Sequence, residues 1–234
     1  MPTKTKYRHE LKYFINFHEY TYLKSRLESS LSLDKNALES KEYHIRSLYF
    51  DDMYQSAEKE KESGDENRKK YRIRIYNLED KLIRLEKKIK NGSMTQKISK
   101  TISRDEYEKI FSGEYTFLLE KKDKFFSTFY AELRMNLLAP VVVVDYDREA
   151  YTYEAGNVRI TFDKYLRTGL GPLDIFDEDM STKHIFEDQV MILEIKYDDF
   201  MPSFIRNLLQ ISRHDISAIS KFLLCKKERR KFYY

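Results

Sequence analysis

The sequence predicts an α+β fold, in which antiparallel strands form a barrel of about eight strands and helices pack outside it. Seven strand-like runs recur along the 234 residues, and short polar turns such as NLED and EAGN join several of them. Such turns favour hairpins over parallel crossovers. Most of the runs alternate apolar residues with Lys, Arg and Glu, and amphipathic segments lie between them. These observations predict charged strand faces that line a lumen.

Five of the seven predicted strands combine an apolar face with a face that mixes Arg, Lys and Glu. In KYRIRIY, Lys70, Arg72 and Arg74 share one face, because side chains alternate along a strand. One such strand alone also fits a sheet with a solvated face, but the helices need the apolar faces, which turns the charged faces inward. The expected strands are residues 8–15, 43–51, 70–78, 81–90, 140–151, 157–167 and 189–197. Their other charged-face residues are Arg8, Glu10, Lys12, Arg84, Glu86, Lys88, Lys90, Arg148, Arg159, Asp163, Glu194 and Lys196.

Capping residues predict the helices. Asn16 precedes a helix over residues 17–31, and Ser103 with Glu106 forms a capping box for a helix that Gly113 ends. Further helices are expected over residues 117–138, after Pro202 and after Asp215. A solvated helix or loop is expected over residues 52–69, and a long mobile loop over residues 168–182.

Composition limits the class of protein. The net charge is only +4, with 43 Lys and Arg against 39 Asp and Glu, so we expect no DNA partner. The single cysteine, Cys225, excludes an internal disulfide framework and a cysteine-rich zinc site. The sequence shows no signal peptide and no run near the roughly 20 apolar residues of a membrane span. We therefore expect a single cytoplasmic domain over residues 1–234.

A lumen with so many cations predicts an anionic ligand. Repulsion and desolvation would destabilise the like charges unless a polyanion compensated them. The glutamates among them need a partner of their own, and a hard divalent cation with oxygen ligands suits them. The pattern therefore indicates a phosphate chain with Mg²⁺ or Mn²⁺. No G-x-x-x-x-G-K-[ST] loop occurs, which excludes a P-loop nucleotide site.

Eight segments resemble a known family. In chain order they are RHELKYFI, IRSLYFDD, KYRIRIY, LIRLEKKIK, YDREAY, VRITFDKYLR, MILEIKY and SAISKF. Together they resemble the VTC domain of polyphosphate polymerases, which belongs to the triphosphate tunnel metalloenzymes. The resemblance implies an eight-stranded antiparallel β-barrel, the triphosphate tunnel. It also implies transfer of the γ-phosphate of ATP, or of another nucleoside triphosphate, to a growing polyphosphate or pyrophosphate chain with Mn²⁺ or Mg²⁺.

The resemblance also implies roles for particular residues. Those expected to hold the reacting phosphates are Arg72, Arg74, Lys88, Arg148, Arg159 and Lys221. Those expected to bind phosphate beside them are Lys12, Lys97, Lys196 and Ser220. Glu194 would hold the metal, with Glu86 or Glu10 as a further ligand. Arg46 is either a further phosphate ligand or, on pattern alone, a structural partner of Asp51 or Asp52. Tyr76 and Tyr146 could line the tunnel, but in a chain with 19 tyrosines the core is the preferred place for them.

Two departures from the family pattern leave the activity open to more than one interpretation. Eukaryotic members have a lysine where this chain has Ala218, and the related tripolyphosphatases have a glutamate where it has Arg8. The second departure favours a polymerase over a hydrolase of triphosphate or polyphosphate. The sequence is also compatible with a polyphosphate-binding module without turnover and, last, with an RNA triphosphatase. Any location at the inner face of a membrane would require a membrane-protein partner subunit.

Overall fold

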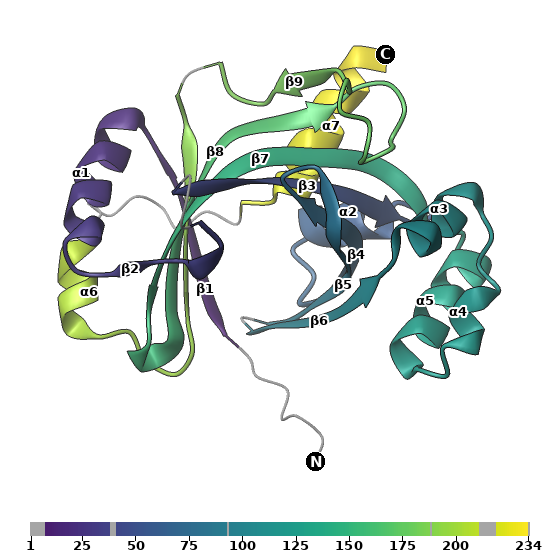
Figure 1. Cartoon of the computed structure of the whole chain (residues 1–234), viewed down its shortest axis with the longest axis horizontal. Helices are drawn as coiled ribbons and strands as arrows, with labels where there is room; N and C mark the ends of the chain where they lie inside the picture. Colours follow the sequence, from purple (N-terminus) through teal and green to yellow (C-terminus); the bar gives the residue numbers. More distant parts are fainter. Residues whose placement is uncertain (1–7, 38–40, 93, 188, 211–218, 234) are drawn as a thin grey trace.

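The computed structural model describes residues 8–37, 41–92, 94–187, 189–210 and 219–233. These residues form a ten-stranded antiparallel sheet with helices around it (Figure 1). The strands are β1 (His9–Ile15), β2 (Ser32–Leu33), β3 (Glu42–Asp51), β4 (Asn67–Tyr76), β5 (Glu79–Asn91), β6 (Met94–Ile102), β7 (Ala139–Tyr153), β8 (Val158–Gly169), β9 (Thr182–His184) and β10 (Met191–Tyr197).

Eight of the strands curl into a tunnel. Their order is β1-β10-β8-β7-β3-β4-β5-β6, and β2 and β9 add to β7 and β8. The two outer strands of this path approach each other where Arg8, just before β1, forms an isolated bridge with Thr95 of β6. Within the described residues, this bridge is the one pairing that joins the two edges, so the sheet is barrel-like without a complete closing ladder. The predicted antiparallel α+β tunnel fold is confirmed.

Helices pack around this sheet, most of them on its outer surface. They are α1 (Phe17–Glu28), α2 (Ser56–Glu62), α3 (Arg104–Ser112), α4 (Phe117–Glu120), α5 (Lys124–Met135), α6 (Ser203–Leu208) and α7 (Lys221–Tyr233). In Figure 1, α1 and α6 lie together on one side of the molecule, and α3, α4 and α5 lie on the opposite side. None of the helices in the described part of the chain combines the length and apolarity that crossing a membrane requires.

The apolar strand faces point outward into these helices. Ile73 of β4 and Leu85 of β5 are fully buried in one core cluster with Phe129 of α5. A second cluster joins α1 and α6 to the outer faces of β8 and β10. A third, which joins α2 and α7 to β3 and β7, lies on the inner face instead, since Ile45, Tyr146 and Phe222 also line an internal cavity. Because the helices take up the apolar faces, the charged faces of the same strands turn inward, as the sequence predicts.

The predicted caps at Asn16 and Ser103 are confirmed. Both form capping boxes, and Gly113 ends α3 with a positive φ of 90°. The single helix expected over residues 117–138 is wrong. Lys122 adopts a φ of 50°, and the Asp123 side chain accepts a hydrogen bond from the Phe125 amide, so a new helix begins there. A backbone break with its own cap therefore interrupts the amphipathic pattern.

Other boundaries also differ from the expectation. Strand β6 was not predicted, because its residues are mostly polar on both faces. Residues 52–69 contain α2 and the start of β4. The expected mobile loop over residues 168–182 is instead packed: Ile175 is fully buried and Met180 belongs to the same core cluster. The predicted cap at Asp215 and the departure at Ala218 lie outside the described residues.

The packing of α5 on the sheet gives a stability prediction. We expect Phe129→Ala to lower the free energy of unfolding by about 3–5 kcal/mol, because it leaves a cavity in the core. The Phe129 ring lies 5.6 Å from Phe50 and 5.2 Å from Tyr71, centroid to centroid. Urea unfolding checks this. Met135→Ala, on the same helix but 81% exposed, is the control and should change stability by at most about 0.5 kcal/mol. Equal effects of the two substitutions would contradict this packing.

Candidate functional site

The inner face of the sheet encloses a cavity of about 520 Å³. Its lining contains two carboxylates, Glu10 and Glu194, four tyrosines and Ser220. Its cations, counted over the described residues, are the fourteen side chains of Arg8, Lys12, Lys61, Arg68, Lys70, Arg72, Arg74, Lys88, Lys90, Lys97, Arg148, Arg159, Lys196 and Lys221. This excess of positive charge in an enclosed space is suited to an anion of high charge.

On β4 and β5, Arg72 and Glu86 form the central ion pair. Glu86 accepts from two guanidinium nitrogens of Arg72, at 2.6 and 2.7 Å, and from Lys97 Nζ at 2.9 Å. Burial alone would raise the pKa of Glu86, but Arg72, Arg74 and Lys97 outweigh it and hold the pKa well below its ordinary value. Arg72 also donates to the Tyr49 hydroxyl at 2.8 Å. The pair fixes the position of Arg72 at the cavity wall.

Arg74 lies beside this pair without a carboxylate of its own. Its guanidinium donates to Ser47 Oγ and to the Tyr146 hydroxyl, both at 3.2 Å. In the part of the chain that the structure describes, no carboxylate forms an ion pair with it, although the side chain is buried. Glu86 offsets its charge only at longer range. A buried guanidinium without a direct ion pair is costly, and an anionic ligand would relieve that cost.

A second anchored group lies on β7, β8 and α7. Arg148 donates to both oxygens of Asp163, at 2.6 and 2.7 Å, and Lys221 approaches the same carboxylate at 2.5 Å. Burial opposes ionisation of Asp163, but these two cations lower its pKa to about 2. Arg159 is held by Asp34 at 2.6 Å and donates to the Tyr43 hydroxyl at 2.7 Å. These contacts orient three cations toward the cavity.

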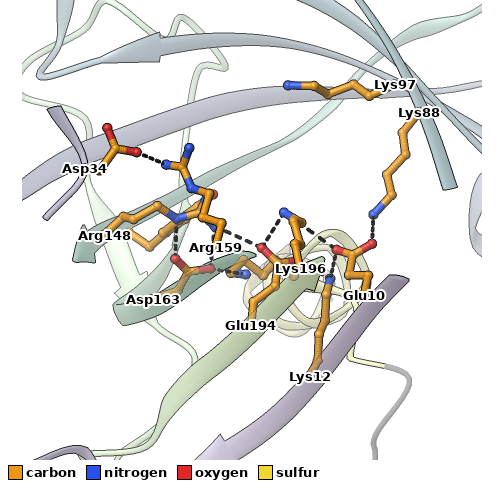
Figure 2. Close-up of polar contacts among 12 residues, drawn as sticks. Glu10, Lys12, Asp34, Lys88, Lys97, Arg148, Arg159, Asp163, Glu194 and Lys196 are labelled. Atoms are coloured by element: carbon orange, nitrogen blue, oxygen red, sulfur yellow. Dashed lines mark hydrogen bonds and ion pairs between the residues drawn. The ribbon is translucent and has the colours of Figure 1, made fainter. Parts of the chain in front are cut away.

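Glu10 and Glu194 project into the cavity from the neighbouring strands β1 and β10 (Figure 2). Lys12 bridges them, with its Nζ 3.2 Å from an oxygen of each. Lys196 Nζ lies 2.7 Å from Glu194 Oε2, and Lys88 Nζ lies 2.7 Å from Glu10 Oε2. Burial opposes ionisation of both glutamates, yet the lysines keep both pKa values below the ordinary value.

The Glu10–Glu194 pair fits a divalent cation that takes only part of its ligands from the protein. No group of three or more His, Cys, Asp or Glu suited to a metal occurs among the described residues, so a closed protein cage is not built here. Mg²⁺ commonly uses one or two carboxylates together with substrate phosphates and water. Glu10 and Glu194 match that donor set. Glu86, the third predicted metal ligand, is instead paired with Arg72 and Lys97 and does not line the cavity.

The structure brings most of the predicted site residues together. Twelve of the fourteen line the cavity; Glu86 and Arg46 do not. Arg46 pairs with Asp145 at 2.9 Å and donates to the Asp177 carbonyl at 2.6 Å. Arg46 therefore lies outside the cavity lining, and the expected pairing with Asp51 or Asp52 is wrong. Arg46 instead fixes the packed loop that contains Ile175.

Several lining residues were missed from the sequence. Arg68 continues the inward alternation of β4 for one more step, and that signal was available. Lys90 was expected on the charged face of β5 but was assigned no role. Lys61 gave no such signal, because it reaches the cavity from α2. Tyr76 and Tyr146, for which the core was preferred over the lumen, belong to or pack against a core cluster and also line the cavity.

Comparison with known proteins identifies the family. The family model of the VTC domain matches residues 7–227, nearly the whole chain. The chain belongs to the VTC domain family. No curated protein matches the chain.

Solved structures resemble the VTC domain in fold. A proposed adenylate cyclase from Bacillus halodurans is 13% identical, with a TM-score of 0.55 over 98% of this chain and 99% of that one. A proposed adenylyl cyclase from Hippeastrum, reported to have a dominant triphosphatase activity, is 13% identical, with a TM-score of 0.56 over 96% of both chains. A protein from Pyrococcus horikoshii is 15% identical, with a TM-score of 0.52 over 95% of this chain and all of that one. At these identities the likeness establishes a shared fold.

The different pairing of the two β4 arginines predicts different effects of their removal. Arg74→Met should weaken tripolyphosphate binding by about tenfold or more and leave stability unchanged or higher, because a buried charge disappears. Arg72→Met should weaken binding and also lower stability by about 1–3 kcal/mol, because Glu86 loses a partner. Calorimetric binding and urea unfolding separate the two effects. Normal tripolyphosphate affinity in both variants would rule out the cavity as the binding site.

Lys70 predicts a pH dependence of binding. Burial, followed by repulsion from Lys61, Lys88 and Arg68, lowers the pKa of Lys70 from 10.5 to about 7. Between these values the unfolded chain binds more protons, so the contribution of Lys70 to stability rises with pH there. A bound phosphate should reverse the shift, so proton uptake should accompany binding and affinity should rise as the pH falls from about 9 to about 7.

Calorimetry in buffers of different ionisation enthalpy measures the protons taken up. Lys70→Gln is the matched control. It removes the titrating lysine, whereas the protonation of the ligand still changes with pH. The same pH slope in the wild type and this variant would contradict the assignment.

Proposed function

We propose that this VTC domain is a polyphosphate polymerase. It transfers the γ-phosphate of ATP, or of another nucleoside triphosphate, to the end of a polyphosphate or pyrophosphate acceptor. The observation that carries the proposal is the enclosed cavity, in which fourteen cations face two carboxylates among the described residues. A cavity of that charge favours phosphate chains over neutral or weakly charged ligands.

Phosphoryl transfer of this kind needs positioning and charge neutralisation more than covalent chemistry by the protein. Arg72 and Arg148 are fixed by Glu86 and Asp163, so their free N–H groups can orient phosphate oxygens with little loss of entropy. Arg74 supplies charge that no described carboxylate pairs with directly. The lining residues assigned to the same task are Lys12, Lys88, Lys97, Arg159, Lys196, Ser220 and Lys221.

Glu10 and Glu194 would hold Mn²⁺ or Mg²⁺. When bound, such an ion supplies further neutralisation of the charge on the β- and γ-phosphates. The protein keeps both carboxylates ionised through Lys12, Lys88 and Lys196. The site is therefore prepared for a cation without having to lose protons first.

The state of the carboxylates favours transfer over hydrolysis. Their pKa values are below the ordinary value, so each is a weak base for a water molecule. No histidine lines the cavity among the described residues. The terminal phosphate of an acceptor chain is already anionic and needs no base. A phosphate oxygen is thus the nucleophile that this site can use directly.

Two rival functions of the same tunnel are distinguished by their products. A hydrolase would release free phosphate with water as the nucleophile, and the triphosphatase activity reported for the Hippeastrum protein favours this candidate. A polyphosphate-binding module would hold the anion without turnover. A cytoplasmic location, at a membrane only through a partner subunit, is part of the proposal.

The decisive assay uses the purified protein with ATP, Mn²⁺ and a pyrophosphate or short polyphosphate primer. We expect a ladder of growing chains with an equal amount of ADP, because each transfer adds one phosphate. Gel electrophoresis measures chain length, and a phosphate assay run in parallel measures hydrolysis. Arg74→Met, whose fold should be intact, is the control and should reduce the ladder strongly. Free phosphate without a ladder would assign a hydrolase, and bound ATP without either product would assign a binding module.

A further inference from the structure

Lys12 occupies the space between the two carboxylates that we assign to the divalent cation. Its Nζ lies 3.2 Å from Glu10 Oε1 and 3.2 Å from Glu194 Oε1 (Figure 2). The contact is built into the sheet, because Lys12 and Glu194 face each other in the register of β1 and β10. A metal ion that joined the two carboxylates would need oxygens that the ammonium group already contacts. The ammonium group and the metal therefore compete for one place.

The other two oxygens of this carboxylate pair are also in contact with cations. Glu10 Oε2 lies 2.7 Å from Lys88 Nζ. Glu194 Oε2 lies 2.7 Å from Lys196 Nζ and 3.4 Å from Nη2 of Arg148. Together with the bridging ammonium group, four cations of the described residues surround two carboxylates. This group of charges is positive overall in the free protein, so it repels a further divalent cation.

One oxygen of the pair shows that the free arrangement is incomplete. Glu10 Oε1 is buried and accepts no hydrogen bond from the described residues, although Lys12 Nζ lies 3.2 Å away. The ammonium group is close enough to offset the charge of this oxygen, but it is not oriented to donate to it. A buried acceptor without a donor is costly. A metal ion would satisfy the same oxygen, because hard divalent cations bind carboxylate oxygens directly.

We propose that Lys12 is an internal counter-cation, which excludes a divalent cation from Glu10 and Glu194 until a phosphate chain binds. A phosphate chain in the cavity offers the ammonium group a new anionic partner, and the flexible stem of lysine lets it turn toward that partner. The chain also adds the negative charge and the oxygen ligands that a metal needs beside two carboxylates. This inference rests on the proposed function for the assignment of the cation site, but not for the reaction that follows.

Two properties of the protein follow from such an exchange of cations. The metal-free protein keeps both carboxylates compensated, so its fold does not require a metal ion. The metal and the phosphate chain also become coupled ligands. By linkage, tripolyphosphate raises the affinity for Mn²⁺ by the same factor by which Mn²⁺ raises the affinity for tripolyphosphate.

The test measures Mn²⁺ binding with and without tripolyphosphate. We expect Lys12→Met to bind Mn²⁺ alone at least about tenfold more tightly than the wild type, because the two carboxylates then lack their shared cation. In the wild type, tripolyphosphate should raise the affinity for Mn²⁺ at least about tenfold, and in Lys12→Met this factor should be clearly smaller. Electron paramagnetic resonance of free Mn²⁺ measures these affinities, and a titration without protein corrects for Mn²⁺ bound by tripolyphosphate in solution.

The matched control removes the same charge elsewhere in the cavity. Lys97 also lines the cavity, but it contacts Glu86. Lys97→Met should therefore change the affinity for Mn²⁺ alone by at most about threefold, through longer-range repulsion. Adding Glu194→Gln to Lys12→Met should abolish the gain, which would locate the bound Mn²⁺ at this carboxylate pair.

Thermal unfolding gives a second measurement, in which a ligand that binds the folded state raises the midpoint. Mn²⁺ alone should raise the midpoint of Lys12→Met, whereas it should raise that of the wild type only when tripolyphosphate is present. Tight binding of Mn²⁺ to the wild type without phosphate would overturn the inference, whether or not the variant folds. Equal Mn²⁺ affinities in the wild type and Lys12→Met, or the same gain in Lys97→Met, would also overturn it.

These results can be told apart from the outcome of the polymerase assay. If the wild type makes no chains but Lys12→Met gains Mn²⁺ binding as expected, the polymerase assignment fails and the counter-cation stands. If the wild type makes chains and binds Mn²⁺ equally well with and without tripolyphosphate, the counter-cation fails and the polymerase stands. No Mn²⁺ binding in any combination would overturn the cation site, and this inference with it.

Discussion

Repulsion between cations in a confined space is the constraint on which the rest of this structure depends. Fourteen Lys and Arg side chains face one cavity of about 520 Å³ in the described residues. Mutual repulsion at such short range opposes folding. The chain offsets it with a few buried carboxylates that each serve two or more cations. Glu86 binds Arg72 and Lys97, Asp163 binds Arg148 and Lys221, and the Glu10–Glu194 pair shares Lys12.

Packing of the helices on the outer strand faces offsets the destabilising repulsion between cations on the inner face. Two apolar clusters connect the outward strand faces to the helices, and a third packs α2 and α7 against the inner faces of β3 and β7. Apolar burial is the main favourable term in folding. The same alternation of side chains that places Arg72 and Arg74 inside places Ile73 between the sheet and α5. A sheet with a more highly charged lumen thus requires more apolar packing between its outer face and the helices. This relation explains why the fold can hold an unpaired Arg74 without losing its sheet.

The distribution of carboxylates divides the cavity into parts with different chemistry. Where cations are paired, their positions are fixed and their charge is partly cancelled, which suits precise orientation of a reacting triphosphate. Where they are unpaired, at Lys61, Arg68 and Lys90, the surface attracts extended anions with less geometric demand. Tyr43 and Tyr76 add aromatic surface to the lining.

The sequence by itself determined the period-two alternation, and with it the antiparallel strands, the charged inner face and most of the lining residues. It also determined the caps at Asn16 and Ser103, because these depend on contacts three residues apart. Only the tertiary structure decided the partners of each charge. Arg46 pairs with Asp145 and Lys61 enters from α2, because long-range strand order and helix packing bring distant residues together. Alternation fixes the face on which a side chain lies, whereas the groups it meets there are set by the fold.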